Sequence, residues 1–291
     1  MTVGVGMNAK GYVHWPEYFA KYGRKEAQGQ THTPFSFGWG HPELPAYEVM
    51  SLYPKYATAF AKSMKSAKPL GGDIRIVGPG ALYDVSWIGE EARVRAGDGQ
   101  PLIVDVGGGL GHLLRDILTE LPGLSPSQCV LQDRGHVVEE ARQASDPVFQ
   151  GIIMIDHDFH QEQPVKGSLP LQTCYRFEIW WLISSFAGAS LYLIRRCLLN
   201  YSDEVATDIL RHLAQALPVD DPKARVIIMD PLRVDTPNPE QCKTDLSMIN
   251  LGGKLRNEKM YTEIVNAAGL KVVNFFARVE TASCVIECAR S

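Results

Sequence analysis

The sequence has 291 residues, of which 45% are hydrophobic and 21% are charged, and its formal net charge is −4. This composition predicts a soluble globular chain, large enough for one substantial domain and a smaller appendage. The charge balance leaves no basic stripe, so nucleic acid is not an expected partner. Six cysteines are scattered without a CxxC pair, which favours free thiols in the cytoplasm over a disulfide framework.

One uncharged run is a candidate membrane segment. Residues 179–194 have the sequence IWWLISSFAGASLYLI, which is shorter than the roughly 20 apolar residues that a spanning helix needs. We therefore expect a buried segment and no membrane partner. Cys284 and Cys288 fall on one face of a predicted strand, but no histidine cluster accompanies them, so no metal site is expected.

The first part of the chain, residues 1–98, is predicted to be a helical region that lines a pocket. Residues 1–45 are rich in glycine, proline and aromatic residues, whereas residues 46–95 show apolar side chains at helical spacings of three and four. These apolar side chains are Tyr47, Met50, Tyr53, Ala57, Phe60 and Met64. The clusters KPLGG and GPGAL divide this stretch into two helices.

From Pro101 onward, apolar strands alternate with amphipathic helices. The predicted strands are 101–106, 129–133, 151–159, 191–199 and 224–232, with a closing pair at 271–279 and 283–290; the predicted helices are 112–121, 136–144, 203–217 and 257–269. Alternation at this length predicts an α/β domain over residues 99–291, with a mostly parallel sheet and helices on both faces.

A glycine turn follows the first of these strands. In VDVGGGLGH, Gly107, Gly109 and Gly111 stand between a strand and a helix, and Asp133 ends the second strand. Glycine allows a sharp turn and close approach of a ligand, the helix start offers free N–H groups, and a carboxylate at the second strand can accept ribose hydroxyls. The alternative is a tight turn with an incidental acid downstream.

This glycine spacing, preceded by Asp105, resembles motif I of the class I S-adenosylmethionine (SAM) methyltransferases. From about residue 30, the chain resembles the caffeate-type small-molecule O-methyltransferases of fungi and plants. The resemblance rests on the stretches VDVGGGLGH, LQDRGHV, HDFHQEQPVKG, RRCLLNYSDE, DLSMINLGGKLR and CVIE. It implies a Rossmann-like SAM-binding domain that follows a helical dimerisation domain.

The same resemblance implies the residues of a SAM site. The glycine loop would contact the methionine part of SAM, Asp133 the ribose and the 158–159 pair the adenine, with a basic residue nearby. The expected set is Asp105, Gly107, Gly108, Gly109, Asp133, Asp158, Phe159 and Arg195.

Two departures from the family concern the length of the chain. The N-terminus begins inside the usual dimerisation domain, which predicts a weakened homodimer. Residues 168–188 interrupt a motif that otherwise continues from PVKG to ASLYLIRR. We interpret this segment as an unspliced intron or, alternatively, as a genuine insertion.

Two further departures concern the chemistry. The family carries a His-Asp-Trp tip, whose histidine is the general base, and a glutamate in GGKER that orients it. Leu199, with Asn200 and Tyr201 after it, occupies the tip here, and Leu255 replaces the glutamate, whereas Glu287 matches a third family acid. A positioned base contributes about 10²- to 10⁴-fold, so a substrate with an acidic hydroxyl tolerates its loss.

Three functions therefore follow from the resemblance. The first is methyl transfer to a hydrophobic small molecule. The second is SAM-assisted pericyclic chemistry of the kind catalysed by leporin-type pericyclases, with Lys254 or Arg256 in place of their tip cation. The third is an inactive SAM-binding paralogue.

Several other side chains are candidates for the site, and some of them have two interpretations. His32 and His41 are either replacement bases or hydrogen-bonding surface histidines, and His112 and His157 are interpreted as structural. The expected substrate-pocket side chains, with core packing as the alternative for the first three, are Phe35, Phe60, Met64, Leu199 and Asn200.

Overall fold

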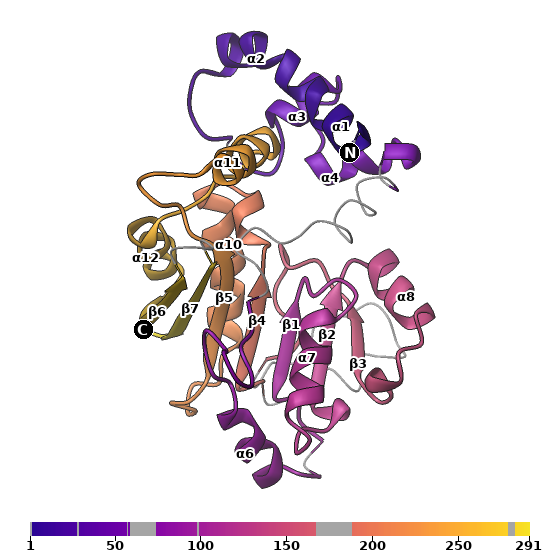
Figure 1. The fold of residues 1–291 in the computed structure, drawn as a ribbon, viewed down its shortest axis with the longest axis vertical. Helices are drawn as coiled ribbons and strands as arrows, with labels where there is room; N and C mark the ends of the chain where they lie inside the picture. The colour runs from indigo at the N-terminus through magenta and orange to yellow at the C-terminus, as the bar shows by residue number, and fades with distance from the viewer. Residues whose placement is uncertain are drawn as a thin grey trace.

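The computed structural model describes residues 2–27, 29–56, 58, 74–97, 99–166, 188–278 and 283–291. Its centre is a seven-stranded sheet in the order β3-β2-β1-β4-β5-β7-β6 (Figure 1). The strands are β1 Ile103–Val106, β2 Cys129–Asp133, β3 Ile153–Asp156, β4 Leu191–Arg195, β5 Arg225–Pro231, β6 Leu270–Arg278 and β7 Ser283–Arg290. The first five pair in parallel and β7 runs antiparallel between β5 and β6, which confirms the predicted Rossmann-like α/β class.

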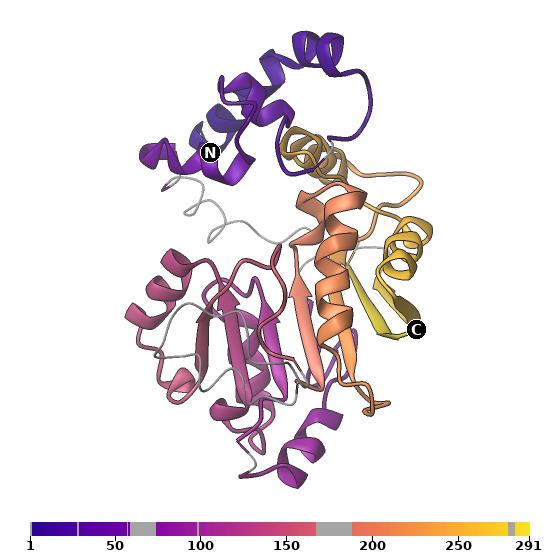
Figure 2. The same ribbon diagram turned by 180° about the vertical axis from the view of Figure 1, so that it is seen from behind.

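Helices cover both faces of the sheet. The described helices after residue 74 are α6 Trp87–Val94, α7 His112–Glu120, α8 Gly135–Gln143, α10 Asp203–Ala216, α11 Pro239–Leu251 and α12 Glu258–Ala267. Short 3₁₀ turns lie at η1 Pro126–Gln128, η2 Pro147–Phe149 and η3 Leu198–Asn200. Apolar side chains of α6 and α7 share one core with the sheet, and those of α10 and α12 share the core on the other face. Figure 2 shows α10 lying along β4 and β5.

Among the described residues before residue 52, four helices form a separate layer at the carboxyl ends of the parallel strands. They are α1 Thr2–Val13, α2 Trp15–Tyr22, α3 Pro34–Gly38 and α4 Ala46–Ser51. Their small core closes on Leu251 of α11, and the Trp15 Nε1 donates to Asn250 Oδ1 over 3.1 Å. The layer is therefore fixed to the sheet domain through α11, and α4 is the part of it that lies nearest the strand ends (Figure 1).

The predicted strands and helices from Pro101 onward are present, and two of the strands are clearly shorter than predicted. The strand predicted over 151–159 is β3, which spans Ile153–Asp156. The run predicted as a strand over 191–199 ends at Arg195, because Arg196 takes a positive φ of 57° and the chain turns into η3. Helices α1, α2 and α11 were not predicted. Residues 74–92 pack into the sheet core, although they precede the predicted boundary at residue 98.

Some expectations fall outside the described residues. These are the interruption at 168–188, apart from Gly188, most of the uncharged run at 179–194, and the side chains Phe60 and Met64. Over the ranges that the structure describes, no helix has both the length and the apolar character needed to cross a membrane.

Candidate functional site

The glycine loop connects β1 to α7 at the carboxyl edge of the sheet. Gly107 has a φ of 66°, and a Cβ atom placed on it would lie 2.8 Å from the Cys197 Sγ and 3.2 Å from the Phe159 ring. Gly109 has a φ of 61°, and a Cβ atom there would meet nothing within 4 Å. The loop is therefore packed against protein at Gly107 and open at Gly109, where a ligand can approach the backbone.

Asp105 lies beneath this loop. Its side chain is buried, and its Oδ2 has no hydrogen-bond partner among the described residues. Burial raises the pKa of Asp105 to about 7; the nearby Arg195 guanidinium acts in the opposite direction and Asp133 adds to the rise. Arg195 therefore lies close enough to the loop to act on Asp105 electrostatically, as expected of the basic residue near the site.

Asp133 is fixed beside the open glycine. Its Oδ2 accepts a hydrogen bond from the Gly109 N–H at 2.8 Å, and its Oδ1 accepts one from the Arg134 N–H at 2.7 Å. Burial raises the pKa of Asp133, and these two backbone bonds oppose the rise. Because each carboxylate oxygen can accept more than one bond, Asp133 keeps acceptor capacity for a ligand hydroxyl.

The segment after β3 folds back over the strand ends toward β4. The Asp158 carboxylate accepts the His160 backbone N–H at 3.1 Å and pairs with Arg134 at 3.1 Å. The Phe159 ring lies 5.9 Å from the Tyr201 ring. Asp158 and Phe159 thus lie within reach of the glycine loop, so the structure brings together the eight side chains and glycines expected for the SAM site.

The tip after β4 contains no group that can take up a proton. Leu199 is 6% exposed and Leu255 is 2% exposed. The Asn200 amide donates to the Arg196 carbonyl at 3.0 Å and to the Cys197 carbonyl at 3.1 Å. The amide is therefore occupied in holding its own turn.

The two loop cations considered for pericyclic chemistry are both occupied. Lys254 pairs with Glu26 and, at 2.5 Å, with Asp203. Arg256 is fully buried. Its guanidinium donates to Asp203 at 2.8 Å, to the Leu198 carbonyl at 2.9 Å and to the Tyr201 carbonyl at 2.8 Å. Neither cation is free to take the place of a tip cation in the structure, because their charges and donors hold the tip to α10.

Glu287 does not reach the site, so its assignment as a retained catalytic acid is wrong. It lies on β7 opposite Ile227, whereas the strand end at Pro231 lies opposite Ser283. Four residues of strand separate the two positions, about 13 Å. The Glu287 carboxylate instead pairs with Arg225 at 2.9 Å and accepts the Tyr83 hydroxyl at 3.2 Å.

Glu287→Gln should therefore leave SAM affinity unchanged within about twofold. It should lower the free energy of unfolding by about 1 kcal/mol, because a neutral amide bonds Arg225 less strongly than a carboxylate does. Titration calorimetry and urea unfolding measure the two quantities. A large loss of SAM affinity with unchanged stability would return Glu287 to the site.

The candidate histidines of the N-terminal layer bond to groups of that layer. The His32 ring, on an exposed residue with a φ of 56°, bonds the Thr31 hydroxyl at 2.8 Å. The His41 Nε2 lies 3.2 Å from the Tyr53 hydroxyl. Phe35 is fully buried in the core of the layer, so it is a packing residue and not a pocket wall.

The two histidines interpreted as structural lie beside the loops of the site. His112, at the start of α7, has its Nδ1 3.2 Å from Arg115. The His157 backbone N–H donates to the Asp133 carbonyl at 2.9 Å, and burial lowers the pKa of its ring to about 4. Both positions agree with the expectation from the sequence.

Three side chains near the site were not predicted: Tyr47, His160 and Tyr201. Tyr47 is 39% exposed; the surrounding protein and then Cys197 and Asp133 raise its pKa. Tyr47 also contributes to the raised pKa of Tyr201, after the larger effect of burial. Tyr47 lies on α4, the part of the N-terminal layer nearest the strand ends (Figure 1). The helical spacing at Tyr47 and Met50 indicated a helix, but not which way it faced.

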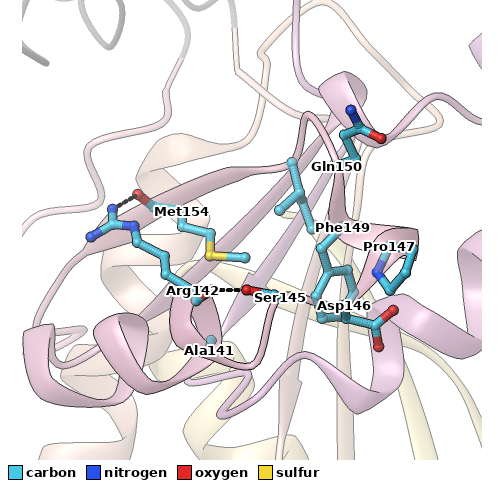
Figure 3. Close-up of a pocket in the computed structure, with 9 residues that line it drawn as sticks. Ala141, Arg142, Ser145, Asp146, Pro147, Phe149, Gln150 and Met154 are labelled. Carbon is cyan, nitrogen blue, oxygen red and sulfur yellow. Dashed lines mark hydrogen bonds between the residues drawn. The ribbon is translucent and has the colours of Figure 1, made fainter.

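A groove of about 660 Å³ lies between α8, η2 and β3 (Figure 3), and its Phe149 packs beneath Gly111 at the end of the glycine turn. It is lined by Ala141, Arg142, Ser145, Asp146, Pro147, Phe149, Gln150, Ile152 and Met154. None of these belongs to the expected site. A second, mostly apolar cavity of about 270 Å³ has Leu255, Val234, Pro237 and Leu246 in its wall.

Several known proteins are similar to this chain in sequence. The methyltransferase pvhD of Talaromyces variabilis is 34% identical over 94% of this chain and 68% of its own length. The chain belongs to the O-methyltransferase family. An O-methyltransferase domain model matches residues 182–271. The methyltransferase cfoD of Aspergillus candidus is 37% identical over 96% of this chain and 63% of its own length, so the chain spans about two thirds of these relatives.

Solved structures share this fold. The structure of LepI in complex with SAM aligns over 97% of this chain and 64% of LepI, with a TM-score of 0.73 and 21% identity. OxaC in complex with sinefungin and meleagrin aligns over 98% of this chain and 64% of OxaC, with a TM-score of 0.76 and 22% identity. At these identities the likeness concerns the fold, and it confirms the Rossmann-like class.

Proposed function

We propose that this O-methyltransferase family member binds SAM and transfers its methyl group to an acidic hydroxyl of a hydrophobic small molecule. The observation that carries the proposal is the position of Asp133, bonded to the Gly109 N–H beside the open face of the glycine loop. A carboxylate at the end of the second strand of such a sheet binds ribose hydroxyls.

The residues present fit SAM in other respects. The unpartnered Oδ2 of Asp105 lies under the loop, where it can accept a bond from a ligand's amino group directly or through water. Asp158 and Phe159 offer a carboxylate and an aromatic face beside the loop. SAM would supply an activated methyl group, and the chain would supply position and exclusion of water.

The apolar tip defines the class of substrate that we propose. Leu199 and Leu255 are both buried, and they stand where the resemblance places two polar groups. Two leucines at these positions favour a hydrophobic molecule. An acidic hydroxyl, as in a tetramic acid, a pyridone or a polarised phenol, ionises without a base at Leu199.

The missing tip base also supports a second candidate, in which bound SAM accelerates dehydration or cycloaddition through its fixed positive charge. A solved structure of a pericyclic reaction enzyme shares this fold, with a TM-score of 0.70 and 22% identity. Mass spectrometry of products formed with SAM and candidate acidic-hydroxyl compounds separates the two activities. Methyl transfer adds a net CH₂ unit to the mass of the substrate, a dehydration removes one water, and an intramolecular cycloaddition gives an isomer. S-Adenosylhomocysteine, which lacks the charge, should not support the pericyclic step.

Asp133→Ala should weaken SAM binding by about 1–3 kcal/mol, which is about 5- to 150-fold, because ribose hydroxyls lose their acceptor. Titration calorimetry with SAM measures the loss. Asp146→Ala is the control, since Asp146 pairs with Arg115 at 2.5 Å and is not one of the residues expected to bind SAM. Equal affinities for wild type and Asp133→Ala would overturn the site.

A further inference from the structure

We infer that His160 is the proton acceptor of this site, in place of the base that Leu199 cannot provide. This inference rests on the proposed function. It names the residue that would take the hydroxyl proton from the substrate when that substrate is not already ionised.

The position of His160 carries the inference. Its ring centroid lies 4.9 Å from the Tyr201 ring, edge to face, and 4.9 Å from the Phe159 ring. Tyr201 follows the tip directly after Asn200, and Phe159 packs against the glycine loop at Gly107. The imidazole therefore packs against one ring that follows the tip of β4 and against another that contacts the loop at the end of β1.

The backbone holds this position. The His160 N–H is bonded to Asp158 Oδ1 at 3.1 Å, and Asp158 is held in turn by Arg134. A side chain that is fixed by ring contacts and a bonded backbone is preorganised, which general-base catalysis requires. His160 is partly exposed, so its ring remains accessible to a ligand.

The charged and titratable groups around His160 favour a neutral imidazole. Burial is the largest cause that lowers its pKa; Arg134 at the start of α8 and His212 of α10 lower it further, and Asp158 opposes them. The Tyr201 phenol faces the ring, and its pKa is raised well above the usual value, chiefly by burial. At neutral pH the imidazole is thus able to accept a proton, and the phenol stays protonated.

The proposed methyl transfer involves only the substrate hydroxyl, SAM, His160 and water. The substrate hydroxyl gives its proton to an imidazole nitrogen of His160, and its oxygen forms a bond to the methyl carbon of SAM. The carbon–sulfur bond breaks, and its electron pair remains on sulfur as S-adenosylhomocysteine. The imidazolium then releases its proton to water.

Nuclear magnetic resonance of the full chain tests the position without a substrate. The His160 ring signals, assigned by comparison with His160→Phe, are titrated with SAM and then with S-adenosylhomocysteine. A sulfonium within about 6 Å disfavours the imidazolium, so the His160 pKa should be about one unit lower with SAM. His14, in the N-terminal layer, is the control and should show equal pKa values in both complexes.

The possible outcomes separate this inference from the proposed function. If neither ligand binds, the proposed function fails. If both bind and the His160 pKa is the same in the two complexes, His160 does not face the reacting end and the inference fails.

The rates of methylation of two phenols provide a second test of His160. His160→Phe keeps the ring contacts and should slow methylation of 4-methylphenol by about 10²- to 10⁴-fold. It should slow methylation of 4-nitrophenol, which is largely ionised near neutral pH, far less. Equal losses for both phenols, or none, would contradict the role, and His14→Gln should leave both rates unchanged. The titration decides the position of the ring even where wild type methylates neither phenol.

Discussion

Arg256→Leu should lower the free energy of unfolding by about 3–5 kcal/mol, chiefly because two carbonyl oxygens at the tip lose their donor. The guanidinium is fully buried and bonds Asp203 and two carbonyl oxygens of the tip, those of Leu198 and Tyr201. Leucine cannot donate to those carbonyls, and each buried acceptor left without a donor costs about 1–3 kcal/mol. Urea unfolding followed by circular dichroism measures the change.

Arg233→Leu is the matched control for this prediction. Arg233 is exposed, so its replacement should change the stability by no more than about 0.5 kcal/mol. Equal effects of the two substitutions would show that Arg256 is not a structural anchor. Its interpretation as a free cation of the site would then be open again.

The sheet and the glycine loop could be predicted because local sequence determines them. Short, mostly apolar runs such as IVDV are typical of parallel strands that are buried between two layers of helices. The φ of 66° at Gly107 and 61° at Gly109 belong to a region that favours glycine, so the turn was visible in the sequence. Asp133 follows from the same logic, since it ends the strand beside that turn.

The roles of Glu287, Lys254 and Arg256 could not be predicted, because each depends on a partner distant in sequence. The β5–β7 register places Glu287 beside Arg225, and a register is a property of the assembled sheet. Lys254 and Arg256 meet Asp203 only once the loop after α11 packs against α10. The family resemblance named these positions but not their surroundings.

Helix α1 was missed for a different reason. Its sequence TVGVGMNAKGYV contains three glycines, and each costs about 1 kcal/mol of helix stability relative to alanine. Packing overrides this preference: a Cβ atom on Gly11 would lie 2.2 Å from the Asn250 Oδ1 of α11. The glycine that argues against a helix in the sequence is what allows the helix to approach α11.

Leu199→His together with Leu255→Glu should increase the rate of methylation, because the pair restores a base at the tip and the acid that orients it. Both leucines are buried, at 6% and 2% exposed, so the two substitutions must be made together. A lone carboxylate in the place of the buried Leu255 would be costly, and an unoriented imidazole would sample unproductive rotamers.

In a His160→Phe background, the Leu199→His and Leu255→Glu pair should raise the rate of 4-methylphenol methylation by up to about 10²- to 10⁴-fold. In the wild type the gain should be smaller, because His160 already accepts the proton, and 4-nitrophenol should gain little in either background. Rates are compared at saturating SAM, with circular dichroism confirming that each variant is folded. A folded double variant that gains nothing with 4-methylphenol in either background would show that Leu199 does not face the reacting hydroxyl.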